Sequence, residues 1–171
     1  MNNEQKRKIL LQFFNEYKFA LYNYAVKILG ENETAEDVVQ NTFLRLYENL
    51  DKIRDEEKIK SWIFITARNE IFGLFRQKKR TIYGYEQTDE GFSKHPADFI
   101  ETAETIDLLK HEISNLNVTN REILILREFG QLSYKEISEI TGLEVSKIKN
   151  RLFKTRKKLM KKLKSLENEN D

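Results

Sequence analysis

The chain has 171 residues, of which 39% are hydrophobic, with one Pro, six Gly and no Cys, so it can hold one ordinary domain or two small ones but no disulfide or thiolate metal site. Its richness in Leu, Ile, Lys and Glu favours helices over a sheet. No stretch reaches the roughly 18 apolar residues of a membrane span, and the N-terminus lacks a secretory signal. We therefore expect a cytoplasmic protein with no membrane insertion.

The net charge is only +2, but it is unevenly distributed. Residues 1–80 carry a net +3, residues 81–107 a net −6 and residues 108–171 a net +5. Basic groups concentrate near the end of each basic segment, which is the electrostatic footprint of a phosphate-binding surface. On charge alone, ordinary solvated helix faces explain the pattern equally well.

The first 80 residues predict three long helices. Apolar residues recur at three- and four-residue steps up to Ile28, and Gly30 suits a C-terminal stop. A second helix is expected to open at Thr34 with a capping-box-like start that includes Asp37. A third is expected from about Glu57 to about Arg80.

Residues 81–103 break the helical periodicity, because Gly84, Gly91 and Pro96 lie among polar and acidic residues. We interpret them as a flexible acidic linker. The predicted fold is therefore all-α, with two small helical domains at residues 1–80 and 104–171.

The second domain should begin with a helix near Glu104. A capping box formed by Thr119 and Glu122 then predicts a helix that stops at Gly130. A second box, formed by Ser133 and Glu136, predicts a short helix that ends at Gly142, followed by a long final helix.

Residues 132–158 have the layout of a helix-turn-helix, in which a short capped helix, a Gly corner and a longer basic helix follow one another. Nine basic and no acidic residues lie between Lys149 and Lys164. Lys and Arg can neutralise phosphates, while Asn150 and Arg151 can read base edges in the major groove. The residues expected to face DNA are Lys147, Lys149, Asn150, Arg151, Lys154 and Arg156. A basic helix that only meets an acidic partner remains a less favoured alternative.

The third helix carries a second candidate nucleic-acid face. Its stripe interleaves aromatic, amide and basic groups, which suits capture of a single strand by stacking and backbone contacts. Its members are Ile65, Arg68, Asn69, Phe72, Arg76 and Lys79, and it ends at Arg80. Phe72 could equally be an ordinary core residue.

The second helix has a mixed polar face with a central Leu, opposite its apolar stripe. It comprises Asp37, Gln40, Asn41, Leu44 and Glu48. Such a face could dock on a protein, although a plain solvated surface is the simpler interpretation.

Three stretches together carry a family resemblance: residues 35–43 (AEDVVQNTF), residues 60–69 (KSWIFITARN), and residues 132–142 (LSYKEISEITG) followed by 145–156 (VSKIKNRLFKTR). In this order and spacing they resemble the extracytoplasmic-function (ECF) subfamily of sigma-70-type RNA polymerase sigma factors. The resemblance spans about residues 8–165.

The resemblance implies an alternative sigma factor that binds core RNA polymerase and directs initiation at specific promoters. The face of Asp37, Gln40, Asn41, Leu44 and Glu48 would dock on the polymerase clamp helices. Asn69 would help capture a flipped base of the -10 element, with Arg68, Phe72, Arg76, Lys79 and Arg80 holding the melted strand. Lys147, Lys149, Asn150, Arg151, Lys154 and Arg156 would read the -35 element.

The family also implies an anti-sigma factor as a partner and a linker that threads the RNA-exit path of the polymerase. Two residues depart from its pattern, since Glu144 stands where a small N-cap residue is more common and Ser146 where Gly is common. A carboxylate there suits the helix dipole but would repel a nearby phosphate.

Three other functions remain as alternatives. The first is a helix-turn-helix regulator that is not a polymerase subunit, and the second is a helical anti-sigma or adaptor protein. An enzyme is the least favoured, because the chain has no GxxxxGK[ST] or HExxH motif and His95 and His111 stand alone. We expect no catalytic residue, cofactor or metal.

Overall fold

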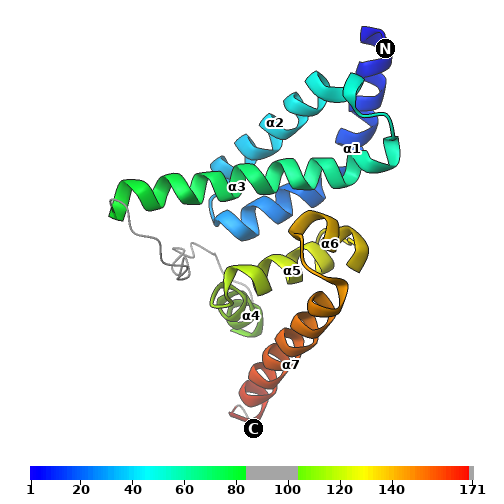
Figure 1. The fold of residues 1–171 in the computed structure, drawn as a ribbon. Helices are drawn as coiled ribbons and strands as arrows, with labels where there is room; N and C mark the ends of the chain where they lie inside the picture. Colours follow the sequence, from blue (N-terminus) through cyan, green and yellow to red (C-terminus); the bar gives the residue numbers. More distant parts are fainter. Residues whose placement is uncertain (84–103, 170–171) are drawn as a thin grey trace.

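A computed structural model describes residues 1–83 and 104–169, and these residues form helices without any strand (Figure 1). The N-terminal group consists of α1 (Asn3–Leu29), α2 (Asn32–Asn49) and α3 (Ile59–Tyr83), with two short 3-10 turns, Leu50–Lys52 and Glu56–Lys58, between α2 and α3. The C-terminal group consists of α4 (Glu104–Ser114), α5 (Val118–Glu128), α6 (Tyr134–Thr141) and α7 (Val145–Glu169). The all-helical prediction is confirmed for the described part of the chain.

The N-terminal group is a three-helix bundle in which α3 crosses both α1 and α2 (Figure 1). Leu21 and Ile28 of α1 meet Leu46 of α2 and Ile63 and Ile71 of α3 in a fully buried core. Gly30 ends α1 in the left-handed conformation (φ 76°), and its N–H donates to the Val26 carbonyl at 2.7 Å. The predicted stop at Gly30 is therefore confirmed.

The C-terminal group contains the predicted helix-turn-helix. The Ser133 hydroxyl accepts a hydrogen bond from the Glu136 N–H at 3.2 Å, and the Glu136 carboxylate accepts one from the Ser133 N–H at 2.7 Å. This capping box opens α6, and Gly142 ends it with φ 74°. Ile137, Ile148 and Leu152 are buried where α6 and α7 pack together.

Two predicted helix starts are wrong. Helix α2 begins at Asn32, so Thr34 lies in its first turn, where its hydroxyl donates to the Glu31 carboxylate at 2.8 Å. Helix α5 begins at Val118, and its N-cap is Asn117, whose side chain accepts from the Asn120 N–H. Thr119 and Glu122 do not form a capping box, because Glu122 is turned into the interior.

Helix α3 extends three residues past its expected end, to Tyr83. The expected linker therefore starts inside a helix, and its remaining residues, 84–103, lie outside the described part of the chain. Among the described helices, none is long and apolar enough to cross a membrane.

The two groups of helices also pack against each other, with α1 against α5 and α3 against α6. This contact was not predicted, since the sequence pattern indicated two modules on a flexible tether. We call this packing the closed arrangement.

We expect the corner of the helix-turn-helix to depend on glycine. An L-residue at a left-handed position costs roughly 1–2 kcal/mol, so Gly142→Ala should lower the free energy of unfolding by about that amount. Gly73→Ala is the matched control, because a Cβ there lies 3.8 Å from its nearest neighbour, in a helix interior where Ala is favoured by about 1 kcal/mol. Urea denaturation should give midpoint shifts of opposite sign, and equal shifts would contradict this account.

Candidate nucleic-acid interface

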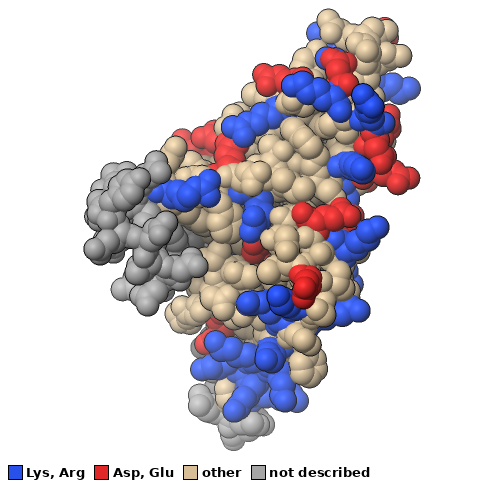
Figure 2. All heavy atoms as spheres, in the orientation of Figure 1, with Lys and Arg blue, Asp and Glu red and all other residues tan. Residues whose placement is uncertain are grey.

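Helix α7 presents its basic side chains to solvent. All six residues predicted to face DNA are exposed: Lys147, Lys149, Asn150, Arg151, Lys154 and Arg156. Ile148, Leu152 and Thr155 are buried on the opposite side of the helix. Figure 2 shows Lys and Arg side chains gathered over the lower part of the molecule, where Figure 1 places α7. The structure therefore brings the predicted -35 residues onto one surface.

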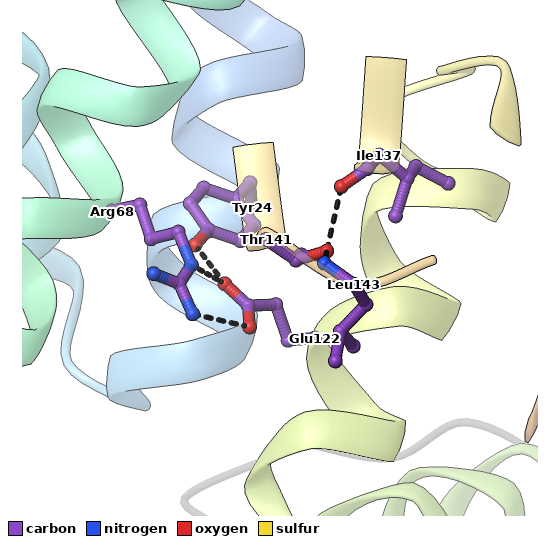
Figure 3. Close-up of polar contacts among 6 residues, drawn as sticks. All are labelled: Tyr24, Arg68, Glu122, Ile137, Thr141 and Leu143. Atoms are coloured by element: carbon purple, nitrogen blue, oxygen red, sulfur yellow. Dashed lines mark hydrogen bonds and ion pairs between the residues drawn. The ribbon is translucent and has the colours of Figure 1, made fainter. Parts of the chain in front are cut away.

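The turn before α7 is fixed by side-chain hydrogen bonds. The Thr141 hydroxyl donates to the Ile137 carbonyl at 2.7 Å and accepts from the Leu143 N–H at 3.3 Å (Figure 3). The Ser138 hydroxyl donates to the Leu143 carbonyl at 2.6 Å. These bonds connect α6 to the residue that follows Gly142, and so hold α7 at a defined angle to α6.

Two arginines of α7 are held by α5. Arg151 Nη1 donates to Asn120 Oδ1 at 2.9 Å, and the Arg156 guanidinium binds Glu128, with Nε at 3.2 Å from Oε1. The hydrogen bond to Glu128 raises the pKa of Arg156. The same carboxylate largely balances the positive charge of Arg156. Asn120 is a positioning residue that the sequence analysis missed, since nothing local links it to Arg151, which is 31 positions further along the chain.

The predicted stripe on α3 is only partly open to solvent. Asn69 and Arg76 are exposed, whereas Ile65 and Phe72 are half-buried against the core. The Phe72 ring packs edge-on to Phe75, with 5.9 Å between ring centroids. Phe72 thus contributes to packing while part of its surface remains accessible. Lys79 and Arg80 lie in α3, but their side chains are outside what the structure describes.

Arg68 reaches into the C-terminal group of helices. Its Nε donates to Glu122 Oε1 at 2.7 Å and its Nη2 to Glu122 Oε2 at 3.3 Å, while the Tyr24 hydroxyl also donates to Glu122 Oε1, at 3.0 Å (Figure 3). Burial alone would lower the pKa of Arg68, but the hydrogen bonds and charge of Glu122 together outweigh it and the pKa is raised. A residue predicted to hold DNA is therefore bound by a carboxylate of the same chain.

The predicted docking face on α2 is exposed in full. Asp37, Gln40, Asn41, Leu44 and Glu48 all face solvent, and Leu44 is 63% exposed. Asn41 Nδ2 donates to Glu70 Oε1 of α3 at 2.8 Å, and Arg45 Nη1 lies 3.7 Å from Glu70 Oε2. Glu70, which no sequence pattern singled out, lies next to Asn69 and thus connects the face on α2 to the part of α3 that carries the stripe.

No group of three or more His, Asp or Glu side chains that could hold a metal ion lies within the described ranges. The geometry instead defines a helical protein with a basic helix-turn-helix and a second, mixed polar and aromatic face on a separate group of helices. This combination is that of a DNA-binding protein with two distinct contact surfaces.

Comparison with known proteins agrees with this class. Residues 13–81 match the family model for Sigma-70 region 2, and residues 106–159 match the model for Sigma-70, region 4. The chain is 30% identical to RNA polymerase sigma factor SigV of Bacillus subtilis, with 92% of this chain and 93% of SigV covered. It is 28% identical to ECF RNA polymerase sigma factor SigW of the same organism, with 88% and 86% covered.

A solved structure of the sigma factor RpoE in complex with the anti-sigma factor NepR, from Bartonella quintana, is also similar. Its TM-score is 0.67 at 26% identity, and the match covers 90% of this chain and 97% of RpoE. The chain belongs to the ECF group of RNA polymerase sigma factors. It is an alternative sigma factor that directs transcription initiation, and these matches do not favour the alternative of a helix-turn-helix regulator outside the polymerase.

Proposed function

We propose that three surfaces of this chain divide the work of initiation. The face of α2 docks on core RNA polymerase, the stripe on α3 captures the melted non-template strand of the -10 element, and α7 reads the -35 element as duplex. Residues 1–80 thus form sigma region 2, residues 104–171 form region 4, and residues 81–103 connect them. The observation that carries this proposal is that the mixed polar face of α2 and part of the stripe of α3 are exposed on one group of helices, while the basic face of α7 is exposed on the other.

The -35 assignment is supported by the shape and charge of α7. A helix of this kind fits the major groove, its lysines can neutralise phosphates, and Arg151 can form a bidentate contact to a guanine. Asn120 supports this role because it holds the Arg151 guanidinium at 2.9 Å and so limits the orientations it can adopt. Glu144, which lies 3.7 Å from Lys147, keeps the start of α7 less cationic than its middle.

The -10 assignment is supported by the exposed amide of Asn69 and by the half-buried aromatic ring of Phe72 one turn further along α3. Amides can hydrogen-bond the edge of an unpaired base, and aromatic rings stack on bases regardless of sequence. Extracting a base from the stack costs on the order of a few kcal/mol. We propose that polymerase binding positions both modules at once, so that strand opening draws on binding energy with no catalytic residue or nucleotide cofactor.

The docking assignment is supported by Leu44, which is exposed among polar residues on α2. An apolar anchor within a polar rim is typical of protein interfaces. We also propose an anti-sigma factor as a regulatory partner and a cytoplasmic location, where polymerase and promoter DNA are found. The similar RpoE structure, in which a sigma factor is bound to an anti-sigma factor, supports the first of these.

Run-off transcription tests the proposed function. Purified chain and core polymerase are incubated with genomic DNA fragments, and transcript 5′ ends are mapped. We expect transcripts from a defined set of start sites with a shared -10 and -35 sequence. Core polymerase alone should give none of them, and random start sites in both samples would contradict the proposal.

Asn69→Ala should weaken strand opening but not polymerase binding, because its amide would contact only an unpaired base. The loss of one such polar contact predicts about tenfold less open complex. Permanganate footprinting measures the open complex, and a core-binding assay runs beside it. Leu44→Ala is the converse control, since it should weaken core binding first. Equal losses in both assays for both variants would contradict the assignment of strand capture to α3 and polymerase docking to α2.

Arg151→Ala should lose discrimination at one -35 position by about 1–3 kcal/mol while core binding stays intact. Asn120→Ala should show part of the same defect, because it releases the Arg151 guanidinium. Lys161→Ala, an exposed basic residue further along α7, should weaken binding equally on all sequences. Competition binding with single-base variants of the -35 element measures the three. If Arg151→Ala kept the same preference among the single-base variants, Arg151 would not be a residue that reads the -35 element.

A further inference from the structure

The two groups of helices meet along a polar seam. Lys60 Nζ of α3 lies 2.8 Å from Glu136 Oε1 of α6, and the hydroxyl of Ser61 donates to Glu139 Oε2 at 3.0 Å. Elsewhere on the seam, Lys27 Nζ of α1 lies 4.3 Å from the centre of the Phe129 ring. Charged and polar contacts of this kind are typical of interfaces between domains that move relative to one another.

Glu122 lies at the centre of this seam. Its side chain is only 2% exposed, and it accepts hydrogen bonds from the Tyr24 hydroxyl and from two nitrogens of Arg68. A buried carboxylate is tolerated only when it is paired and hydrogen-bonded. These donors belong to α1 and α3, so the closed arrangement is what satisfies the charge that α5 carries.

The two oxygens of Glu122 bind Arg68 in the way that a phosphate would. The guanidinium presents a planar fork of N–H groups, and carboxylate and phosphate both fit this fork with two parallel hydrogen bonds. The Arg68 guanidinium also lies 4.6 Å from the Phe72 ring, so the carboxylate holds it over the aromatic member of the stripe. One guanidinium fork cannot serve Glu122 and a DNA phosphate in the same geometry.

The reading surface of α7 is not covered in this way. Lys149, Asn150 and Lys154 remain exposed while the two groups are packed together. The closed arrangement therefore affects the two nucleic-acid surfaces unequally. It engages Arg68 of the strand-capturing stripe and leaves the duplex-reading helix open.

We propose that Glu122 is an internal competitor of single-stranded DNA for Arg68, and that it keeps this one member of the -10 surface occupied until the two groups of helices separate. This inference rests on the proposed role of Arg68 in holding the melted strand. In the closed chain the apparent affinity for a single strand is reduced by the fraction of molecules that are open. Any partner that holds the groups apart, core polymerase above all, releases Arg68 at the moment when it is needed.

The test uses the full chain and two independent readouts. Because the sequence contains no Cys, Glu33→Cys on α2 and Lys161→Cys on α7 give a pair of unique labelling sites for energy transfer between fluorophores. The binding probe is a fluorescent single-stranded oligonucleotide with the non-template -10 sequence mapped by run-off transcription. A duplex that contains the -35 sequence serves as the second probe. Its binding is measured with chain that carries neither Cys substitution nor fluorophore.

Glu122→Gln should lower the energy transfer and bind the single-stranded probe about tenfold more tightly, because the amide removes the competing charge. Binding of the -35 duplex should not change. Glu112→Gln is the matched control, since this carboxylate pairs with Lys162, at 3.9 Å, inside the C-terminal group. It should alter neither readout. Tyr24→Phe removes one donor to Glu122 without a change of charge. It should also lower the energy transfer, but by less than Glu122→Gln does.

Three results would overturn the proposal. An open Glu122→Gln chain with unchanged affinity for the single strand would show that Arg68 is not being competed for. Unchanged energy transfer in both Glu122→Gln and Tyr24→Phe would show that Glu122 does not hold the seam. If Glu122→Gln does not fold, as judged by circular dichroism, an unchanged Tyr24→Phe chain is decisive.

A separate measurement distinguishes this proposal from the proposed function. Arg68→Ala in the assembled holoenzyme should reduce the open complex, whether or not Glu122 competes in the free chain. If Arg68→Ala reduces the open complex while Glu122→Gln leaves the affinity for the single-stranded probe unchanged, only the competitor role of Glu122 is wrong. If Arg68→Ala leaves the open complex unchanged, the role of Arg68 in strand capture is wrong as well.

Discussion

The carboxylate of Glu122 is almost inaccessible to solvent, so its hydrogen-bond donors must come from the protein itself. It finds them in the Tyr24 hydroxyl and the Arg68 guanidinium, on two helices of the other group. Because an unpaired buried charge is costly, this one requirement fixes how α5 lies against α1 and α3. The contacts at the edge of the seam, such as the pair of Lys60 and Glu136, follow from that placement.

The same constraint decides which surfaces of this sigma factor are open. The basic side of α7 points away from the seam and stays exposed, as does the face of α2 around Leu44. The stripe on α3 starts at the seam, and so Arg68 is engaged there while Asn69, one residue further, faces solvent. The three surfaces proposed to act in initiation are thus not equally available in the closed arrangement.

Smaller polar contacts connect the surfaces to one another. Glu70 accepts a hydrogen bond from Asn41 and so joins the face of α2 to α3 beside the stripe. Asn120 orients the Arg151 guanidinium, and Glu128 balances the charge of Arg156. Two side chains of α5 therefore influence the orientation and charge of the reading surface of α7. Helix α5 therefore contacts both the duplex-reading helix and, through Glu122, the strand-capturing one.

Features that depend on neighbouring residues could be predicted from the sequence. The capping box of Ser133 and Glu136 and the stops at Gly30 and Gly142 were predicted correctly, because their hydrogen bonds and dihedral angles are local. The same local pattern failed at Thr119 and Glu122. The spacing suited a capping box, but burial against Tyr24 and Arg68 stabilises Glu122 more than an exposed cap would.

Periodicity and charge pattern were enough to predict the helical class, the helix-turn-helix and the faces on α2 and α7, since they show which side of a helix is apolar. The sequence also carried the family resemblance, which the comparisons confirmed. The packing of the two groups of helices and the binding of Arg68 by Glu122 became visible only in the folded chain. The partners involved lie 54 and 98 positions apart along the chain, where no local pattern can connect them.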